Sequence, residues 1–170
     1  TDMILVLDKS GSMEENDRMN IMKRGAIAQL DTLTFLDYVQ VISYSNDVET
    51  AGDILLQATD ENKQKLIEFI ENLESGGTTK GKLGLKKAFE IFVDSHQASK
   101  TSGCNRIISF LTDGKMTGID TDNFIENGWL EDQQKNLEDN YGLSRAHIFT
   151  YALGDGAKSS DMRSLSCRNQ

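Results

Sequence analysis

Apolar residues follow two patterns along this chain: short continuous runs, and sets spaced as on one face of a helix. The first run, five residues from Met3 to Leu7, predicts a strand buried on both faces, as in a parallel sheet. Further runs predict strands at 38–45, 106–112 and 147–153, the last also buried. A weaker stretch from about 48 to 56 predicts a short strand paired as a hairpin with 38–45.

Helical spacing of apolar residues fills the segments between these strands. The expected helices cover about 17–33, a segment capped by Thr59 or Asp60, about 82–95, about 131–139, and a last one from Ser159 or Ser160. Asn16 or Asp17 is the expected N-cap of the first helix, and Gly142 the expected end of the helix at 131–139. Alternating strands and helices predict a doubly wound α/β fold, a mainly parallel central sheet flanked by helices.

Length and charge narrow the class of protein. A chain of 170 residues fits a single domain over 1–170. Because Thr1 adjoins the first strand and Gln170 follows soon after the last expected helix begins, we expect a piece of a longer protein. The net charge of −9 argues against a nucleic-acid partner, which requires clustered Lys and Arg. Apolar runs are all shorter than the roughly 18 residues of a membrane span, so we expect no direct membrane insertion by this chain.

Side chains with oxygen atoms gather where three segments leave the predicted sheet. The carboxyl ends of parallel strands meet at one edge of a sheet, where ligands bind. The residues in question are Asp8, Ser10 and Ser12 after the first strand, Thr78 and Thr79 in the loop 75–81, and Asp113 after the strand 106–112. Hard oxygen ligands of this kind suit Mg²⁺, Ca²⁺ or Mn²⁺ rather than zinc or copper.

The charge of this ligand set indicates how a bound ion would be used. Two carboxylates and three neutral hydroxyls, with one of the two threonines counted, hold a divalent ion without completing its coordination or neutralising it fully. One coordination position stays open to an acid from outside. The pattern therefore predicts a protein partner that presents an Asp or Glu, with the metal as the bridge.

Catalytic alternatives lack residues that they require. A phosphatase of the haloacid dehalogenase type needs a second Asp two residues after its nucleophile, where this chain has Ser10. The G-x-S-x-G sequence of serine hydrolases and the glycine-rich loops of nucleotide-binding proteins are absent from the sequence. We therefore expect a binding protein and not an enzyme. The simpler alternative is that Ser10, Ser12 and Asp113 only cap helices and turns.

The motifs at these three positions resemble those of the von Willebrand factor A (VWA) domain. Asp8 to Ser12 match its D-x-S-x-S motif, while 76–79 and 111–114 are similar to its second and third elements. The resemblance implies a Rossmann-like fold with a metal-ion-dependent adhesion site. Ser10 and Ser12 would then bind the ion directly, together with one threonine, and Asp8 and Asp113 would do so directly or through water. Alignment on Gly76 and Gly77 selects Thr78, and alignment on the following helix selects Thr79, which we prefer.

Within this family the chain most resembles the A domain of the alpha-two-delta auxiliary subunits of voltage-gated calcium channels. The similar segments are 43–45, 88–91 and 148–151, together with Cys104 and the late Cys167. The resemblance implies an extracellular or cell-surface location and a membrane-associated parent protein. The alternative function is a structural A domain that stabilises a larger assembly without exchanging ligands.

Two features stay open at this stage. Cys104 and Cys167 are compatible with two buried thiols, one disulfide, or partners outside this chain. Lys9, at the variable position of the D-x-S-x-S motif, places a positive charge beside the predicted metal. Its side chain either points into solvent or weakens the affinity for the ion.

Overall fold

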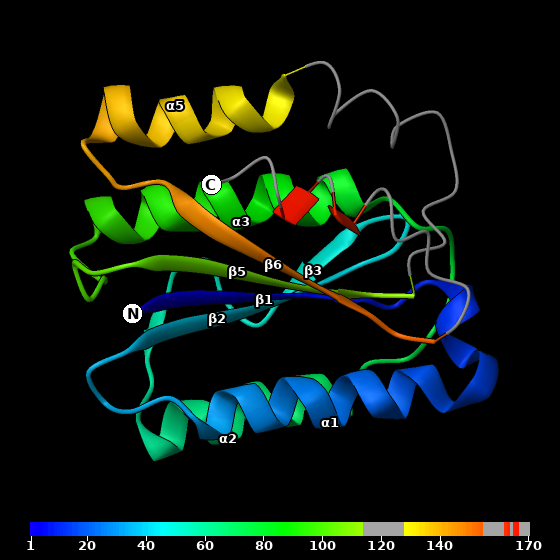
Figure 1. Ribbon diagram of the computed structural model, residues 1–170. Helices are drawn as coiled ribbons and strands as arrows, with labels where there is room; N and C mark the ends of the chain where they lie inside the picture. Colours follow the sequence, from blue (N-terminus) through cyan, green and yellow to red (C-terminus); the bar gives the residue numbers. More distant parts are fainter. Residues whose placement is uncertain (114–127, 155–161, 164, 167–170) are drawn as a thin grey trace.

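In the part of the chain that the structure describes, the fold is built on one mixed sheet of six strands (Figure 1). The computed structural model describes residues 1–113, 128–154, 162–163 and 165–166. Four parallel strands form the centre and one edge, in the order β2 (Tyr38–Tyr44), β1 (Asp2–Asp8), β5 (Arg106–Thr112) and β6 (Ala146–Ala152). Two short strands, β3 (Val48–Thr50) and β4 (Leu56–Gln57), pair antiparallel with β2. The expected single strand at 48–56 is thus two separate ones.

Helices cover both faces of the sheet, which gives the three layers that the sequence predicts (Figure 1). One face carries α1 (Arg18–Asp31) and α2 (Asp60–Glu71), and the other carries α3 (Gly81–Gln97) and α5 (Trp129–Tyr141). A 3-10 segment, η1 (Gly11–Asp17), joins β1 to α1. The prediction of a doubly wound, mainly parallel α/β fold is confirmed. None of the described helices is long and apolar enough to cross a lipid bilayer.

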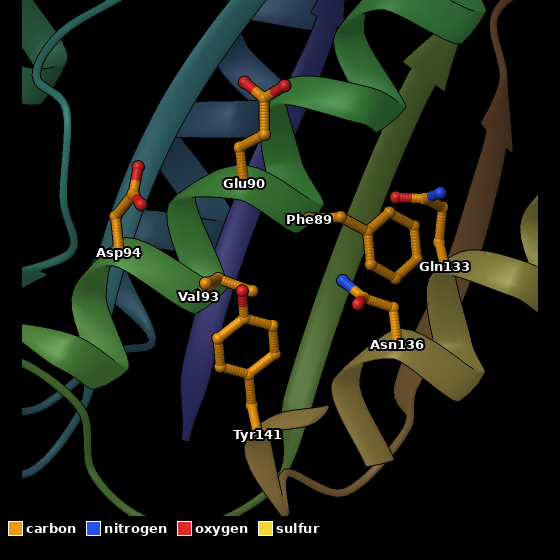
Figure 2. Close-up of a pocket in the computed structure, with 7 residues that line it drawn as sticks. All are labelled: Phe89, Glu90, Val93, Asp94, Gln133, Asn136 and Tyr141. Atoms are coloured by element: carbon orange, nitrogen blue, oxygen red, sulfur yellow. The ribbon is translucent and has the colours of Figure 1, made fainter. Parts of the chain in front are cut away.

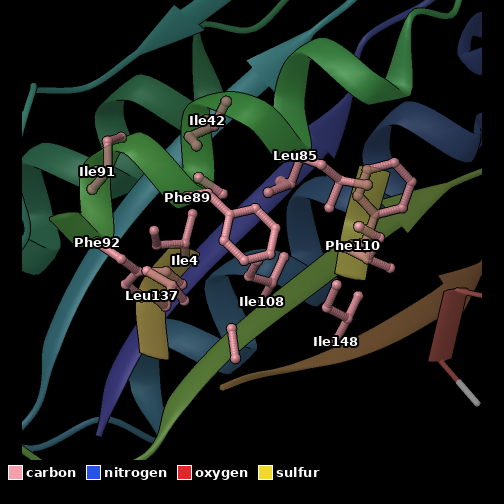
Figure 3. Close-up of a cluster of buried hydrophobic side chains, with 14 of the residues drawn as sticks. Ile4, Ile42, Leu85, Phe89, Ile91, Phe92, Ile108, Phe110, Leu137 and Ile148 are labelled. Atoms are coloured by element: carbon pink, nitrogen blue, oxygen red, sulfur yellow. The ribbon is translucent and has the colours of Figure 1, made fainter. Parts of the chain in front are cut away.

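Alternate residues of the central strands point into two separate cores. On β1, Ile4 and Val6 face the core beneath α3 and α5, and Leu5 and Leu7 face the core beneath α1 and α2. All four side chains are fully buried. Figure 3 shows the first core, where Phe89 and other side chains of α3 lie over β1 and β5. Burial on both faces explains why β1 is a continuous apolar run and not an alternating one.

Helix boundaries agree with most of the capping predictions. Thr59 is the N-cap of α2, and its hydroxyl accepts a hydrogen bond from the backbone N–H of Asn62 at 3.3 Å. Gly142 follows α5 with a φ of 64°, a conformation that favours glycine. At α1 the N-cap is Asp17, one of the two residues expected, but its side chain does not act as a cap. Asp17 precedes the helix but has a φ of 61°, and its side chain accepts no capping hydrogen bond.

The prediction that the strand at 147–153 is buried on both faces is also wrong. Ala146 and Ile148 of β6 pack into the core beneath α5, whereas Phe149 and Tyr151 are 49% and 45% exposed. The physical reason is position, since β6 is the outermost described strand of the sheet and pairs with β5. A sequence run does not reveal which strand lies at an edge.

Some expectations concern segments outside the described residues. These are the start of the last helix near Ser159 or Ser160, and the environment of Cys167. Cys104 is exposed and forms no disulfide with a described residue. A buried thiol is therefore the wrong expectation for Cys104.

Close packing of α3 on the sheet gives a first prediction. A Cβ added at Gly84 would lie 2.7 Å from Val6 Cγ1 and 2.9 Å from Tyr44 Cδ1. Alanine favours a helix over glycine by about 1 kcal/mol, but overpacking costs about 1–3 kcal/mol. We expect Gly84→Ala to lower the free energy of unfolding in urea. Gly76→Ala, with no atom within 4 Å of the new Cβ, is the control. Equal stability of the two variants would contradict the close packing.

Candidate metal-ion site

The predicted site lies at the carboxyl end of β1, where the connections to the two neighbouring strands lie on opposite faces of the sheet. Asp8 is the last residue of β1, which has β2 on one side and β5 on the other. The chain reaches β2 through α1 on one face of the sheet, and reaches β5 through α3 on the opposite face (Figure 1). In doubly wound sheets, this point of divergence leaves a crevice in which ligands bind.

Two hydrogen bonds fix the carboxylate of Asp8. Its Oδ1 accepts from the backbone N–H of Ser10 at 2.8 Å, and its Oδ2 accepts from the Thr112 hydroxyl at 2.6 Å. Asp8 itself has no exposed surface. Thr112 is the last residue of β5, so this contact joins the ends of two neighbouring strands. The carboxylate is thereby held in one orientation.

The phenol of Tyr44 is buried near this carboxylate. Tyr44 is the last residue of β2, and its ring stacks on Phe110 with the ring centres 5.3 Å apart. Burial, and next the negative charge of Asp8, raise the pKa of Tyr44 well above its ordinary value. Tyr44 is therefore a neutral wall of the site and not a second anion.

The hydroxyls of Ser10 and Ser12 lie at a distance suited to a shared cation. Their Oγ atoms are 3.2 Å apart, and Ser10 is buried. Neighbouring oxygens in an octahedral shell are about 3.0 Å apart around Mg²⁺ and about 3.4 Å apart around Ca²⁺, from metal–oxygen distances of about 2.1 and 2.4 Å. The donor set of the β1 loop therefore fits an oxygen-bound divalent ion of either size.

The loop that carries the threonines is joined to the β1 loop through the main chain. The N–H of Gly11 donates to the carbonyl of Gly77 at 3.0 Å, and the N–H of Gly76 donates to the carbonyl of Lys9 at 2.7 Å. A further contact joins this loop to the turn after β2, where Asn46 accepts hydrogen bonds from Thr78. The two loops predicted to contribute ligands thus lie side by side.

The two candidate threonines have different surroundings. Thr78 is exposed, and its hydroxyl donates to Asn46 Oδ1 at 2.6 Å. Thr79 is 6% exposed, and its hydroxyl has no hydrogen-bond partner among the described residues. Of the two threonine hydroxyls, that of Thr79 therefore has no competing partner in the described structure.

Asp113 and an arginine that the sequence analysis missed complete the described site. Asp113 follows β5 and has no exposed surface. The Nη1 atom of Arg18 donates to Asp113 Oδ2 at 3.2 Å, to the carbonyl of Ser12 at 3.1 Å and to Glu15 Oε2 at 3.2 Å. The residue is only 5% exposed. A guanidinium ion thus joins the β1 loop to the end of β5.

A signal for Arg18 was present in the sequence. The buried residues of α1 lie four positions apart, at Met22, Ala26 and Leu30, and the same step backwards gives Arg18. An arginine on the apolar face of a helix needs a buried anion. Thr112 was also missed as a partner of Asp8, although its place at the end of a strand beside Asp113 indicated that it belonged to this edge.

Lys9, the residue after β1, forms an ion pair with β3. Its ammonium group pairs with Glu49 Oε1 on β3 at 2.6 Å, and its side chain is 14% exposed. Of the two alternatives for Lys9, a side chain in solvent is wrong, and a weaker affinity for the ion stays a prediction. The carboxylate of Glu49 neutralises the charge of Lys9.

The electrostatics of the site favour uptake of a cation. Burial raises the pKa of Asp8, the hydrogen bonds from Ser10 and Thr112 oppose that shift, and the charge of Asp113 adds to it. A divalent ion bound here would relieve the cost of the buried charges. Among the described residues, no group of three or more His, Cys, Asp or Glu side chains is close enough to hold a metal. A site at this edge therefore depends on hydroxyl ligands as well as carboxylates.

A second hollow lies elsewhere on the molecule. Figure 2 shows a groove of about 370 Å³ between α3 and α5, with Phe89, Val93 and Tyr141 among its lining residues. None of the predicted ligands lines it. The groove is thus separate from the candidate metal site.

The buried charge of Asp8 leads to a stability prediction. Because folding raises the pKa of Asp8, its stabilising contribution is complete below the ordinary value of 3.8 and is lost as the pH rises through the raised pKa. At neutral pH, without metal, the ionised carboxylate therefore opposes folding. We expect Asp8→Asn to raise the melting temperature of the chelator-treated protein by about 2–4 °C, the size of an effect of about 1 kcal/mol.

The control for this prediction is the same pair of proteins near pH 3.5, where the difference should shrink because Asp8 is then largely protonated in both states. A lower melting temperature for Asp8→Asn at neutral pH would contradict the argument. It would mean that the carboxylate hydrogen bonds outweigh the cost of burial.

The sequence of the chain was compared with those of characterised proteins. Rat voltage-dependent calcium channel subunit alpha-2/delta-3 is 27% identical over 174 aligned positions, covering 99% of this chain and 15% of the relative. Human subunit alpha-2/delta-2 is 32% identical over 115 positions, covering 66% of this chain and 10% of the relative. The chain thus spans only about a seventh of the length of the first of these relatives.

Solved structures with the same fold include a von Willebrand factor type A protein from Catenulispora acidiphila, with a TM-score of 0.75, 18% identity, and coverage of 99% of this chain and 37% of that one. Mussel byssus proximal thread matrix protein 1 with a zinc-occupied MIDAS motif gives a TM-score of 0.69 and 19% identity, over 98% of this chain and 41% of that one. The family model for the von Willebrand factor type A domain matches residues 3–115. This chain therefore belongs to the von Willebrand factor type A domain family.

Proposed function

We propose that this domain binds a divalent cation at the end of β1, and that an Asp or Glu of a protein partner completes the coordination of that ion. The observation that carries the proposal is the pair of hydroxyls on Ser10 and Ser12, 3.2 Å apart beside the fixed and buried carboxylate of Asp8. The zinc-occupied motif in the mussel protein supports a cation at this place in the fold.

The ligands we propose are Ser10, Ser12 and Thr79 as direct ligands, with Asp8 and Asp113 bound directly or through water. Thr79 is preferred to Thr78 because the hydroxyl of Thr78 is exposed and donates to Asn46. An all-oxygen set favours Mg²⁺, Ca²⁺ or Mn²⁺. Zinc belongs in the test as well, because it occupies the motif of the mussel protein.

The setting we propose is a binding module of a cell-surface or extracellular, channel-associated protein. The support is the similarity to calcium channel alpha-2/delta subunits, across nearly the whole chain for alpha-2/delta-3. The module acts by binding and not by catalysis. A phosphatase of the haloacid dehalogenase type needs an acid two residues after its nucleophile. At that position this chain has Ser10, whose hydroxyl lies beside that of Ser12.

Metal binding is tested by calorimetric titration of Mg²⁺, Ca²⁺, Mn²⁺ and Zn²⁺ into chelator-treated protein. We expect saturable binding by the natural sequence. In Asp8→Asn and Asp113→Asn the affinity should fall about 100-fold or more, because each variant removes a charge but keeps the side-chain volume. If the natural protein binds none of the four ions, the motif residues only cap helices and turns.

The choice between the threonines is tested by a matched pair of alanine variants. We expect Thr79→Ala to weaken metal binding about tenfold or more, through loss of a direct ligand. Thr78→Ala should leave the affinity within about twofold, since its hydroxyl is bound to Asn46. The reverse order would assign the ligand to Thr78.

Ligand exchange is tested with a short peptide that contains one Asp and with the same peptide carrying Asn instead. We expect only the acidic peptide to bind, and only when metal is present. A structural A domain gives a different result: chelation lowers the melting temperature, and neither peptide binds in either state. That outcome would replace the adhesion proposal with the structural one.

A further inference from the structure

The hydroxyl of Tyr44 is buried and has no hydrogen-bond partner among the described residues. Tyr44 is the last residue of β2, and its side chain has no exposed surface. A buried O–H without a partner destabilises a folded protein, and most such groups in native proteins bond to another protein group or to ordered water. The hydroxyl therefore indicates a polar partner that the described residues do not supply.

The register of the strands places this side chain beside the carboxylate of Asp8. Asp8 and Tyr44 are paired residues of β1 and β2, so their side chains leave the sheet on the same face. Burial raises the pKa of Tyr44, and the nearby charges of Asp8 and Asp113 add to that shift. The phenol thus keeps its proton at neutral pH, and its hydroxyl is a hydrogen-bond donor that borders the predicted metal site.

Close packing fixes the ring of Tyr44 and, with it, the position of the hydroxyl. The ring stacks on Phe110 of β5, with the ring centres 5.3 Å apart and the planes 19° from parallel. Helix α3 also lies close to the ring, since a Cβ added at Gly84 would be 2.9 Å from Tyr44 Cδ1. Side chains packed in this way stay in one rotamer. The hydroxyl consequently cannot turn away toward another acceptor.

We propose that Tyr44 is a positioning residue of the metal site, and that its hydroxyl donates a hydrogen bond to a water molecule in the coordination shell of the bound ion. Water is the fitting acceptor because Mg²⁺ and Ca²⁺ commonly keep water among their ligands in proteins. Both carboxylate oxygens of Asp8 already accept hydrogen bonds, from Ser10 and Thr112. By holding that water in place, the hydroxyl increases the affinity for the ion. This inference rests on the metal-binding part of the proposed function.

A role in packing alone predicts different behaviour of Tyr44→Phe, which removes only the oxygen. If the ring alone matters, the variant binds metal as well as the natural protein does. If the hydroxyl stabilises the metal-free domain, the variant melts at a lower temperature. The proposal predicts opposite effects. The metal-free variant becomes more stable because an unpaired buried group is gone, whereas metal binding weakens because the hydrogen bond formed in the loaded state is lost.

The experiment measures two quantities for each protein: the melting temperature after chelator treatment, and the affinity for Mn²⁺ by calorimetry. For Tyr44→Phe we expect a melting temperature about 2–4 °C higher and Mn²⁺ binding about three- to tenfold weaker. Ultraviolet difference spectra give a direct signature of the hydrogen bond. Addition of Mn²⁺ should shift a tyrosine absorption band in the natural protein and leave the spectrum of Tyr44→Phe without that shift.

Ser43→Ala is the matched control. Ser43 precedes Tyr44 on β2 and is also fully buried, and its hydroxyl likewise has no partner among the described residues. Its side chain points to the opposite face of the sheet, because its register partner is Leu7, which lies in the core beneath α1 and α2. We expect the affinity of Ser43→Ala for Mn²⁺ to stay within about twofold of that of the natural protein.

The outcomes distinguish this inference from the proposed function. If the natural protein binds Mn²⁺ and Tyr44→Phe binds it equally well, or if Tyr44→Phe lowers both the affinity and the melting temperature, the role of Tyr44 is overturned and metal binding stands. An equal loss of affinity in Ser43→Ala also overturns it. A natural protein that binds no Mn²⁺ overturns both proposals. Weaker binding by a Tyr44→Phe variant that melts no lower, with an unchanged Ser43→Ala, supports the assignment.

Discussion

Two carboxylates are buried at the ends of neighbouring strands, and the structure at this edge of the sheet depends on that constraint. Asp8 and Asp113 have no exposed surface, so each charge must be balanced by hydrogen bonds, by a cation, or by protonation. The hydrogen bonds from Ser10 and Thr112 and the guanidinium of Arg18 supply part of that balance. A divalent ion bound at this edge, as we propose, would add to that balance.

Much of the fold was predictable because the central strands are buried on both faces. The run 3–7 is wholly apolar, and the segment 106–112, with four apolar residues, agrees with the bounds of β5 in the structure. The edge strand β6 was predicted to be buried, because a local run of residues does not show how many strands will pair with it. Asp17 is the N-cap of α1, as expected, but the kink at the end of η1 gives it a φ of 61° and its side chain accepts no capping hydrogen bond.

The candidate site was predictable in part. Short motifs near strand ends identify Asp8, Ser10, Ser12 and Asp113, and the structure places all four at one edge of the sheet. Arg18 was missed because an arginine at the start of a helix usually lies in solvent, and only its alignment with Met22 and Ala26 shows otherwise. The choice between two adjacent threonines needed the hydrogen bond to Asn46, a contact 32 residues away in sequence.

The two loops of the site are joined by backbone hydrogen bonds, from Gly11 to Gly77 and from Gly76 to Lys9. Because both bonds use only main-chain atoms, the spacing between the loops does not depend on the side chain at position 9. Substitutions there can alter the charge beside the site while the ligand geometry is inherited unchanged. An evolving family can in this way acquire new partners without rebuilding the proposed metal site.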